Sequence, residues 1–238
     1  MVEAGLAEDA KQALTLIMTG QVLVDDTPHT KAGEQLATHR SLRLKSGQKE
    51  HSWVSRGGEK LAHGLDHFRV DPTGKVALDV GASTGGFCDV LLQHSAQKVY
   101  AVDVGYGQLA WKLAQDERIV NLERTNCRTL STEIIPDPID LLVSDVSFIS
   151  LTLALPAAIT LMGADAIGIV LVKPQFEAPQ QDVGAGGIIS DPTVRQAALE
   201  RVIQWLPSQG CQLLGHTPSP ITGTKGNIEY LLGFSKSA

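Results

Sequence analysis

The sequence lacks the marks of secreted, disulfide-rich and zinc-binding proteins. It has only three cysteines, Cys88, Cys127 and Cys211, which are far apart and odd in number. Their spacing fits neither a disulfide framework nor a zinc site, so we expect reduced thiols in a cytoplasmic protein and no metal site. Residues 1–4 have neither a basic start nor an apolar core, and no secretory signal is therefore predicted.

A long uninterrupted hydrophobic run is also missing. The one candidate spans residues 151–172, and Pro156, Gly163 and Asp165 interrupt it. A membrane-spanning helix needs about 20 nearly unbroken apolar residues. We therefore predict a helix, a turn and a buried strand in this stretch, and no stable association with a membrane.

Positive charge is not in excess, because 20 Lys and Arg stand against 26 Asp and Glu and the net charge is -6. Any contact with nucleic acid would therefore depend on a local basic patch. The chain does have 238 residues, 43% of them hydrophobic. This is enough for one core with a small appendage, and the composition is typical of a soluble α/β protein.

The pattern changes near residue 50, which predicts two domains, residues 1–50 and 51–238. In the first, Leu14, Ile17 and Met18 have helical spacing, and Gly20 follows as a C-terminal cap. Short strands are predicted at residues 21–24 and 42–45, and the polar residues 46–51 suit a linker.

The second part alternates strands with helices. Strands are predicted at residues 76–80, 99–104, 119–122, 141–143, 167–172 and 230–234. Asp191 and Pro192 are typical of an N-cap and a first helical position, and open a helix that ends before Gly210. This alternation predicts an α/β fold with a mostly parallel sheet and helices on both faces.

A glycine-rich turn separates the first of these strands from a helix. Such glycines allow the backbone to approach a ligand closely. The next strand ends at Asp103, about 20 residues further on, where doubly wound folds place an acid that binds a ribose diol. The predicted cofactor-binding residues are Asp79, Gly81, Ala82, Ser83, Thr84, Gly85, Gly86, Phe87 and Asp103.

Two alternatives remain open for this turn. It can be a plain glycine turn without a ligand, with Asp103 as a solvated aspartate. A nicotinamide dinucleotide is the competing ligand, but its fingerprint is G-x-G-x-x-G, whereas Ala82 and Ser83 follow Gly81 here. The acid before the first glycine and the wider glycine spacing resemble the loop of a methyltransferase.

Charged residues end two further strands. Asp145 follows the fourth predicted strand and Lys173 follows the fifth. In open parallel sheets the ligand crevice lies beyond the carboxyl ends of the strands, so both should face the crevice of the glycine turn. Because Lys173 ends an apolar run, partial desolvation disfavours its charged form.

Several motifs together resemble the TlyA family, whose members are often called haemolysins and are similar to FtsJ-type ribosomal RNA 2′-O-methyltransferases. They are SRGGEKL at residues 55–61, DVGASTGGF at 79–87, AVDVGYGQL at 101–109 and GNIEY at 226–230. The match covers residues 52–236. The resemblance implies a Rossmann-like fold with a seven-stranded sheet, S-adenosylmethionine as cofactor, and ribose methylation, at cytidine, of ribosomal RNA or ribosomal subunits.

The resemblance also implies a catalytic Lys-Asp-Lys-Glu tetrad, which falls on Lys60, Asp145, Lys173 and Glu229. A ribose 2′-hydroxyl is a weak nucleophile, and Lys173 would take or orient its proton. Lys60 would add a second positive charge, and the two carboxylates would hold the lysines. Taken alone, Lys60 can also be a solvated helix lysine, and Glu229 an ordinary strand-edge carboxylate.

Residues 1–50 resemble the second half of the S4-type RNA-binding domain that the family carries, as an N-terminally truncated α+β unit. They contain six Lys or Arg and seven Asp or Glu, a weak electrostatic footprint for RNA. Basic residues that can share one face are predicted to bind RNA: Lys11, Arg40, Arg43, Lys45 and Arg56.

Other functions stay open at this point. A membrane-active haemolysin would need an amphipathic or apolar segment that enters lipid. A cofactor-binding protein associated with RNA but without catalysis is the third possibility. Residues 174–191 form a loop longer than most connections, which is either a lid over the crevice or a surface loop. The sequence indicates no oligomeric state.

Overall fold

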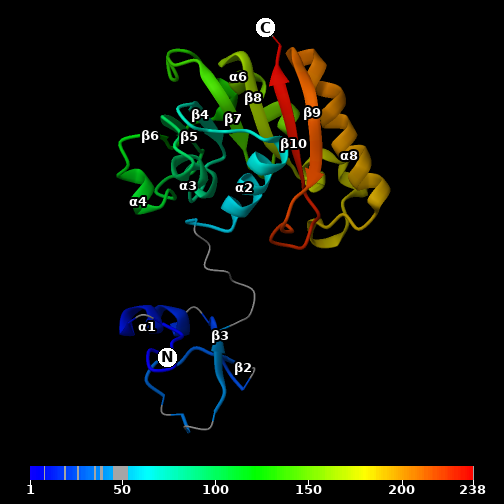
Figure 1. Cartoon of the computed structure of the whole chain (residues 1–238). Helices are drawn as coiled ribbons and strands as arrows, with labels where there is room; N and C mark the ends of the chain where they lie inside the picture. Colours follow the sequence, from blue (N-terminus) through cyan, green and yellow to red (C-terminus); the bar gives the residue numbers. More distant parts are fainter. Residues whose placement is uncertain are drawn as a thin grey trace. The chain divides into compact units, whose positions relative to one another are not determined.

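The structure, a computed structural model, describes residues 1–7, 9–18, 20–25, 27–34, 36–37, 40–44 and 53–237. The chain separates into two compact units, Met1–Glu50 and His51–Ala238 (Figure 1). The predicted residue Lys45 lies outside the described residues, and so does the predicted linker, residues 46–51.

The first unit combines one helix with a small antiparallel sheet. Helix α1 spans Ala10–Met18, and strands β1 (Val22–Val24), β2 (Thr27–His29) and β3 (Leu42–Leu44) pair in the order β2-β1-β3. Gly20 follows α1 with φ +67°, as its predicted role as a cap requires. The predicted apolar stripe of α1 is wrong in part, because the side chains of Leu14 and Met18 are exposed and Ala13 is buried instead.

The second unit is built on a seven-stranded sheet in the order β6-β5-β4-β7-β8-β10-β9. Its strands are β4 (Val76–Val80), β5 (Lys98–Val102), β6 (Ile119–Leu122), β7 (Ile139–Ser144), β8 (Met162–Val172), β9 (Cys211–Pro218) and β10 (Tyr230–Lys236). Strands β4 to β8 are parallel, and β10 runs antiparallel to both β8 and β9. The predicted mostly parallel sheet is confirmed.

Helices cover both faces of this sheet (Figure 1). They are α2 (Gly57–Phe68), α3 (Gly86–Gln93), α4 (Trp111–Ala114), α5 (Leu151–Ala154), α6 (Pro156–Thr160), α7 (Pro174–Glu177) and α8 (Pro192–Trp205). Side chains of β4 alternate between two apolar clusters, Ala77 toward α2 and α3, and Leu78 toward α5, α6 and α8. Burial of apolar residues on both faces explains why the strands read as nearly continuous hydrophobic runs.

The strand order reverses at β4, which has β5 on one side and β7 on the other. In doubly wound sheets, ligands bind beyond the carboxyl ends of the strands at such a reversal. The stretch 151–172 forms α5, α6 and β8, so the predicted order of helix and then strand is confirmed, but the helix is divided in two and the strand begins at Met162 and not at residue 167. Within the described parts of the chain, no helix is long and apolar enough to cross a membrane.

Candidate functional site

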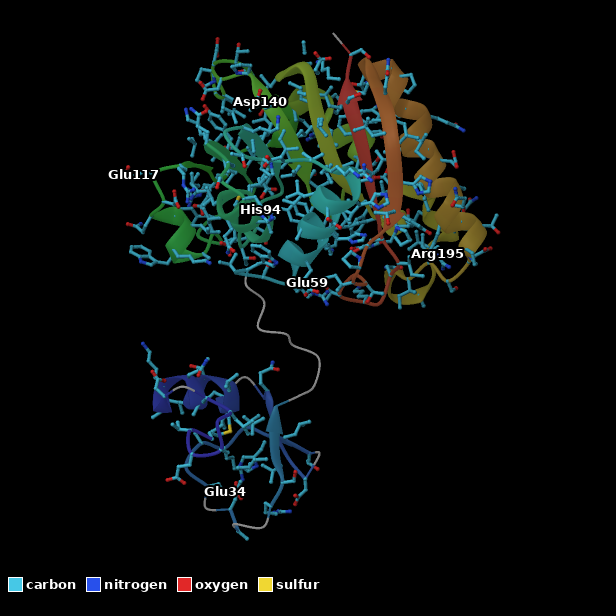
Figure 2. The ribbon with its side chains drawn as sticks, viewed as in Figure 1. Glu34, Glu59, His94, Glu117, Asp140 and Arg195 are labelled. Atoms are coloured by element: carbon cyan, nitrogen blue, oxygen red, sulfur yellow. The ribbon has the colours of Figure 1, made fainter. Side chains whose placement is uncertain are left out.

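A cavity of about 530 Å³ opens at the carboxyl ends of the central strands. Its walls come from the start of α2, the loops after β4, β7 and β8, and residues 223–229 before β10. Glu59, labelled in Figure 2, marks the first turn of α2, where the neighbouring Lys60 reaches the cavity wall. The cavity therefore lies where the strand order predicts a ligand site.

The glycine-rich turn forms one side of this cavity. Gly81 has φ +87°, and a Cβ atom at this position would lie 3.0 Å from Cγ1 of Val146 and 3.2 Å from its backbone. A side chain at this position would therefore be strained and crowded. Six of the predicted cofactor-binding residues line the cavity: Gly81, Ala82, Ser83, Thr84, Gly86 and Phe87.

Asp103 lies beside the glycine-rich turn, although it is not part of the cavity wall. One carboxylate oxygen accepts a hydrogen bond from the backbone N–H of Ser83 at 2.8 Å, and the other accepts one from Gly105 at 2.7 Å. These bonds fix the orientation of the carboxylate. Each oxygen keeps a second lone pair, with which it can accept a hydrogen bond from a hydroxyl group.

Asp79 and Gly85, also predicted to bind cofactor, lie behind the cavity wall. The carboxyl group of Asp79 is fully buried, and its Oδ2 accepts a hydrogen bond from Sγ of Cys88 at 3.0 Å. Its Oδ1 has no hydrogen-bond partner among the described residues. Burial raises the pKa of Asp79 to about 7. Gly85 has φ +92° and packs against Leu113.

The structure brings the four predicted catalytic residues together from four distant segments. Nζ of Lys60 lies 2.7 Å from Oε2 of Glu229 and 3.6 Å from Oδ2 of Asp145. Nζ of Lys173 lies 2.6 Å from Oδ1 of Asp145, as an ion pair without the alignment of a hydrogen bond. Asp145 thus bridges the two ammonium groups.

Three of these four charged residues are buried, and the side chain of Asp145 is 22% exposed. Lys60 is 6% exposed, so it is not the solvated helix lysine that its sequence context alone allows. Glu229 is 2% exposed, so it is not an ordinary strand-edge carboxylate. Buried charges are unfavourable unless they are paired. Here two ammonium groups and two carboxylates face one another, so the charge of the cluster is balanced if all four are ionised.

Residues 53–236 match the FtsJ-like methyltransferase family. The chain belongs to this family. It is 44% identical over 232 residues to the 16S/23S rRNA (cytidine-2′-O)-methyltransferase TlyA of Mycobacterium tuberculosis (strain CDC 1551 / Oshkosh), covering 98% of this chain and 86% of that protein. It is 40% identical over 231 residues to Hemolysin A of Brachyspira hyodysenteriae, covering 97% and 95%.

A solved structure from Streptococcus thermophilus, described as a hemolysin, superposes with a TM-score of 0.79 at 38% identity and covers 98% of this chain and 84% of that one. These likenesses confirm the resemblance to the TlyA family that the motifs carry. The cofactor of this methyltransferase is S-adenosylmethionine. The backbone cradle at Gly81 and the fixed carboxylate of Asp103 fit such a nucleoside-containing cofactor.

Several residues of the methyltransferase site were not predicted. The hydroxyl oxygen of Ser147 accepts a hydrogen bond from Nζ of Lys173 at 2.7 Å. Phe148 is 90% exposed, has φ +66°, and its ring lies 5.2 Å from that of Phe176. These residues follow strand ends, but the pattern of a single sequence does not distinguish them from ordinary loop residues.

Asn227 was also missed, and it holds the predicted lid segment. Its Oδ1 accepts from the backbone N–H of Ile189 at 2.9 Å, and its Nδ2 donates to the carbonyl of Gly187 at 2.8 Å. The segment contains α7 and two short 3-10 turns, Gln180–Asp182 and Ala185–Gly187. It is therefore tied to the chain that carries Glu229; its movement as a lid stays a prediction.

The predicted RNA-binding residues fall in different units. Arg56 belongs to the second unit, lines the cavity, and donates a hydrogen bond to Oγ1 of Thr224 at 3.2 Å. In the first unit, Lys11 is exposed on α1 and Arg40 pairs with Asp25 at 2.5 Å. Arg43 lies on β3. The charge of Arg40 is thus partly offset by a neighbour, and RNA binding by these residues stays a prediction.

Proposed function

We propose that this methyltransferase transfers a methyl group from S-adenosylmethionine to the ribose 2′-hydroxyl of cytidine in ribosomal RNA. The observation that carries the proposal is the paired charge cluster of Lys60, Asp145, Lys173 and Glu229 in the same cavity as the glycine-rich turn. The name of the Mycobacterium tuberculosis relative supports the choice of nucleotide and RNA.

Each residue of the cluster has a role in the proposed chemistry. When bound, the cofactor supplies an activated methyl group on a sulfonium. Lys173 must be neutral to take the proton of the 2′-hydroxyl, and as an ammonium group it can only orient that hydroxyl; an acid–base group of this kind typically contributes about two to four orders of magnitude in rate. Lys60 adds a second positive charge beside the developing oxyanion, while Asp145 and Glu229 hold the two lysines in place.

The residues around the cluster suit the two substrates. We assign Asp103 to the ribose hydroxyls of the cofactor, because its two oxygens are already oriented by backbone N–H groups. Phe148 offers an exposed ring at the cavity, and exposed aromatic rings are surfaces on which nucleobases stack. We assign Arg56, which lines the cavity, to a phosphate of the RNA.

Incorporation of a labelled methyl group tests the proposed function. Purified small and large ribosomal subunits, together with their naked RNAs, are incubated with the protein and labelled S-adenosylmethionine. We expect label in ribosomal RNA, with reverse-transcription stops at cytidine when nucleotides are limiting. Absence of label from every RNA form, with the cofactor bound, would contradict the proposal.

Calorimetry with S-adenosylhomocysteine tests the cofactor assignment separately. We expect binding by the intact protein and weaker binding by Asp103→Ala. Undiminished affinity in the variant would remove Asp103 from the site.

A membrane-active function is the second candidate, and the name of the Brachyspira hyodysenteriae relative favours it. Leakage of dye from liposomes, measured beside methyl transfer, separates the two functions. Because the cavity and its charges have no use in a pore, we expect methyl transfer without leakage. Leakage that persists in variants of the charged cluster would support a separate membrane activity.

A further inference from the structure

The ammonium group of Lys173 has three contacts, and only two of them involve Asp145. Its side chain is 9% exposed, and Nζ lies 2.6 Å from Oδ1 of Asp145 and 3.5 Å from the Asp145 carbonyl oxygen. The third contact is the hydrogen bond to the hydroxyl of Ser147, at 2.7 Å. Ser147 is therefore the one of these contacts that does not belong to Asp145, and it accepts a hydrogen bond of normal length.

The backbone beside Ser147 is held in an uncommon conformation. Phe148, the next residue, has φ +66° although it is not glycine. A left-handed conformation costs an L-residue roughly 1–2 kcal/mol, and such strain persists only where the surroundings impose it. The turn at Phe148 sends its ring outward while the Ser147 hydroxyl faces Lys173.

A buried carboxylate ties this loop to the segment that follows Lys173. Glu177, at the end of α7, accepts hydrogen bonds from Oγ of Ser150 at 2.6 Å and from the backbone N–H of Leu151 at 2.8 Å. The ring of Phe176 also contacts that of Phe148. Both partners of the contact between Ser147 and Lys173 thus lie on segments that Glu177 and Phe176 hold together.

We propose that Ser147 is a positioning residue for Lys173, an inference that rests on the proposed function. Its hydroxyl oxygen accepts a hydrogen bond from the ammonium group and keeps Nζ directed into the cavity, where the ribose hydroxyl is to bind. Nζ already lies at contact distance from Asp145, 2.6 Å, so without this hydroxyl both remaining contacts belong to Asp145 and the flexible lysine side chain can turn about them. A displacement of about 1 Å in a reacting group can lower a rate roughly a hundredfold.

Variants of Ser147 test this role in single-turnover methylation at saturating RNA and cofactor. We expect Ser147→Ala to lower the rate roughly tenfold to a hundredfold, with unchanged affinity for S-adenosylhomocysteine. Ser147→Thr keeps the hydroxyl and should recover most of the rate. Ser147→Cys keeps the volume but has a poor acceptor, and should behave as alanine does.

Ser150→Ala is the matched control, because it removes a hydroxyl from the same loop that contacts Glu177 and not Lys173. We expect it to lower the melting temperature more than the rate. A wild-type rate in Ser147→Ala, equal losses in Ser147→Ala and Ser150→Ala, or no recovery in Ser147→Thr would each overturn the proposal.

A second measurement does not depend on activity. In protein labelled with ¹⁵N at the lysine side chains, the Nζ signal of Lys173 is assigned by its loss in Lys173→Arg. Exchange of its protons with water should become several-fold faster in Ser147→Ala and stay unchanged in Ser150→Ala. Unchanged exchange in Ser147→Ala would contradict the inference, whereas a wild-type protein that methylates no RNA would contradict only the proposed function.

Discussion

The two sides of the cavity are built in opposite ways. The glycine-rich side comes from one continuous stretch, residues 81–87, and offers backbone and small side chains to a ligand. The charged side comes from four segments, and its side chains meet only because the starts of α2 and β10 and the ends of β7 and β8 lie beside one another. One side depends on local shape and the other on tertiary assembly, so each can be damaged while the other stays intact.

The largest effect is expected on the charged side. Lys173→Ala removes the group that takes or orients the proton, and the rate should fall about two to four orders of magnitude. Lys173→Arg should also fail, because guanidinium cannot act as a base near neutral pH. Single-turnover methylation and calorimetry measure the two sides separately. If Lys173→Ala lost cofactor affinity by the same factor as it lost rate, the two sides of the cavity would not be independent.

A buried carboxyl group, that of Asp79, lies behind the glycine-rich side. Its raised pKa predicts that the stability of the protein depends on pH. The ordinary pKa of 3.8 for Asp79 is raised to about 7 by burial. Between about pH 4 and pH 7 the native protein keeps a proton that the unfolded chain has released, so the free energy of unfolding falls as pH rises.

Asp79→Asn cannot lose this proton, so it should be more stable than the wild type above pH 7, by up to a few kcal/mol. Urea unfolding at pH 5, 7 and 8.5 measures the effect. Parallel stability curves for the two proteins would show that Asp79 does not titrate in this range.

Adding one methyl group at Gly81, in the glycine-rich turn, should weaken cofactor binding. Gly81→Ala places a Cβ atom 3.0 Å from the side chain of Val146 in a backbone with positive φ. We expect about tenfold weaker cofactor binding, since the loop must shift by a few tenths of an ångström against the ligand. Gly107→Ala is the control, because φ is +65° there and a Cβ atom would have nothing within 4 Å. Equal losses in both would mean that only backbone strain matters.

The smallest effect concerns the first unit, which we propose to be S4-like and to contribute RNA affinity and not chemistry. Lys11→Glu with Arg43→Glu should weaken binding of ribosomal RNA several-fold and reduce its salt dependence, because phosphate contacts release counterions. Cofactor affinity and the single-turnover rate at saturating RNA should stay unchanged. A filter-binding titration at two salt concentrations checks this, and unaltered affinity would remove these residues from the interface.

The same contrast explains what the sequence could predict. The turn between β4 and α3 is local, so its glycines and the following Asp103 are recognisable from spacing alone. Strand β9 was missed because it is an edge strand whose residues are mostly exposed, and it therefore shows no apolar run. Strand β2 was missed because Thr27–His29 is too short to show alternation.

The charged side was less accessible to residue patterns. Asp145 and Lys173 could be placed at strand ends, but Lys60 and Glu229 entered only through the resemblance to the TlyA family. Taken alone, Lys60 looks like a solvated lysine, and only tertiary structure shows that it is buried. Ser147 could not be predicted for the same reason, because its hydrogen-bond partner Lys173 lies 26 residues away along the chain.

Analysis of the methylated nucleoside tests the central claim most directly, because the charged cluster is assigned to a ribose hydroxyl and not to a base. Ribosomal RNA methylated by the wild-type protein is digested to nucleosides and separated by mass spectrometry, with RNA treated by Lys173→Ala as the control. The account predicts 2′-O-methylcytidine that is absent from the control. A base-methylated nucleoside, or the same 2′-O-methylcytidine formed at a normal rate by Lys173→Ala, would contradict it.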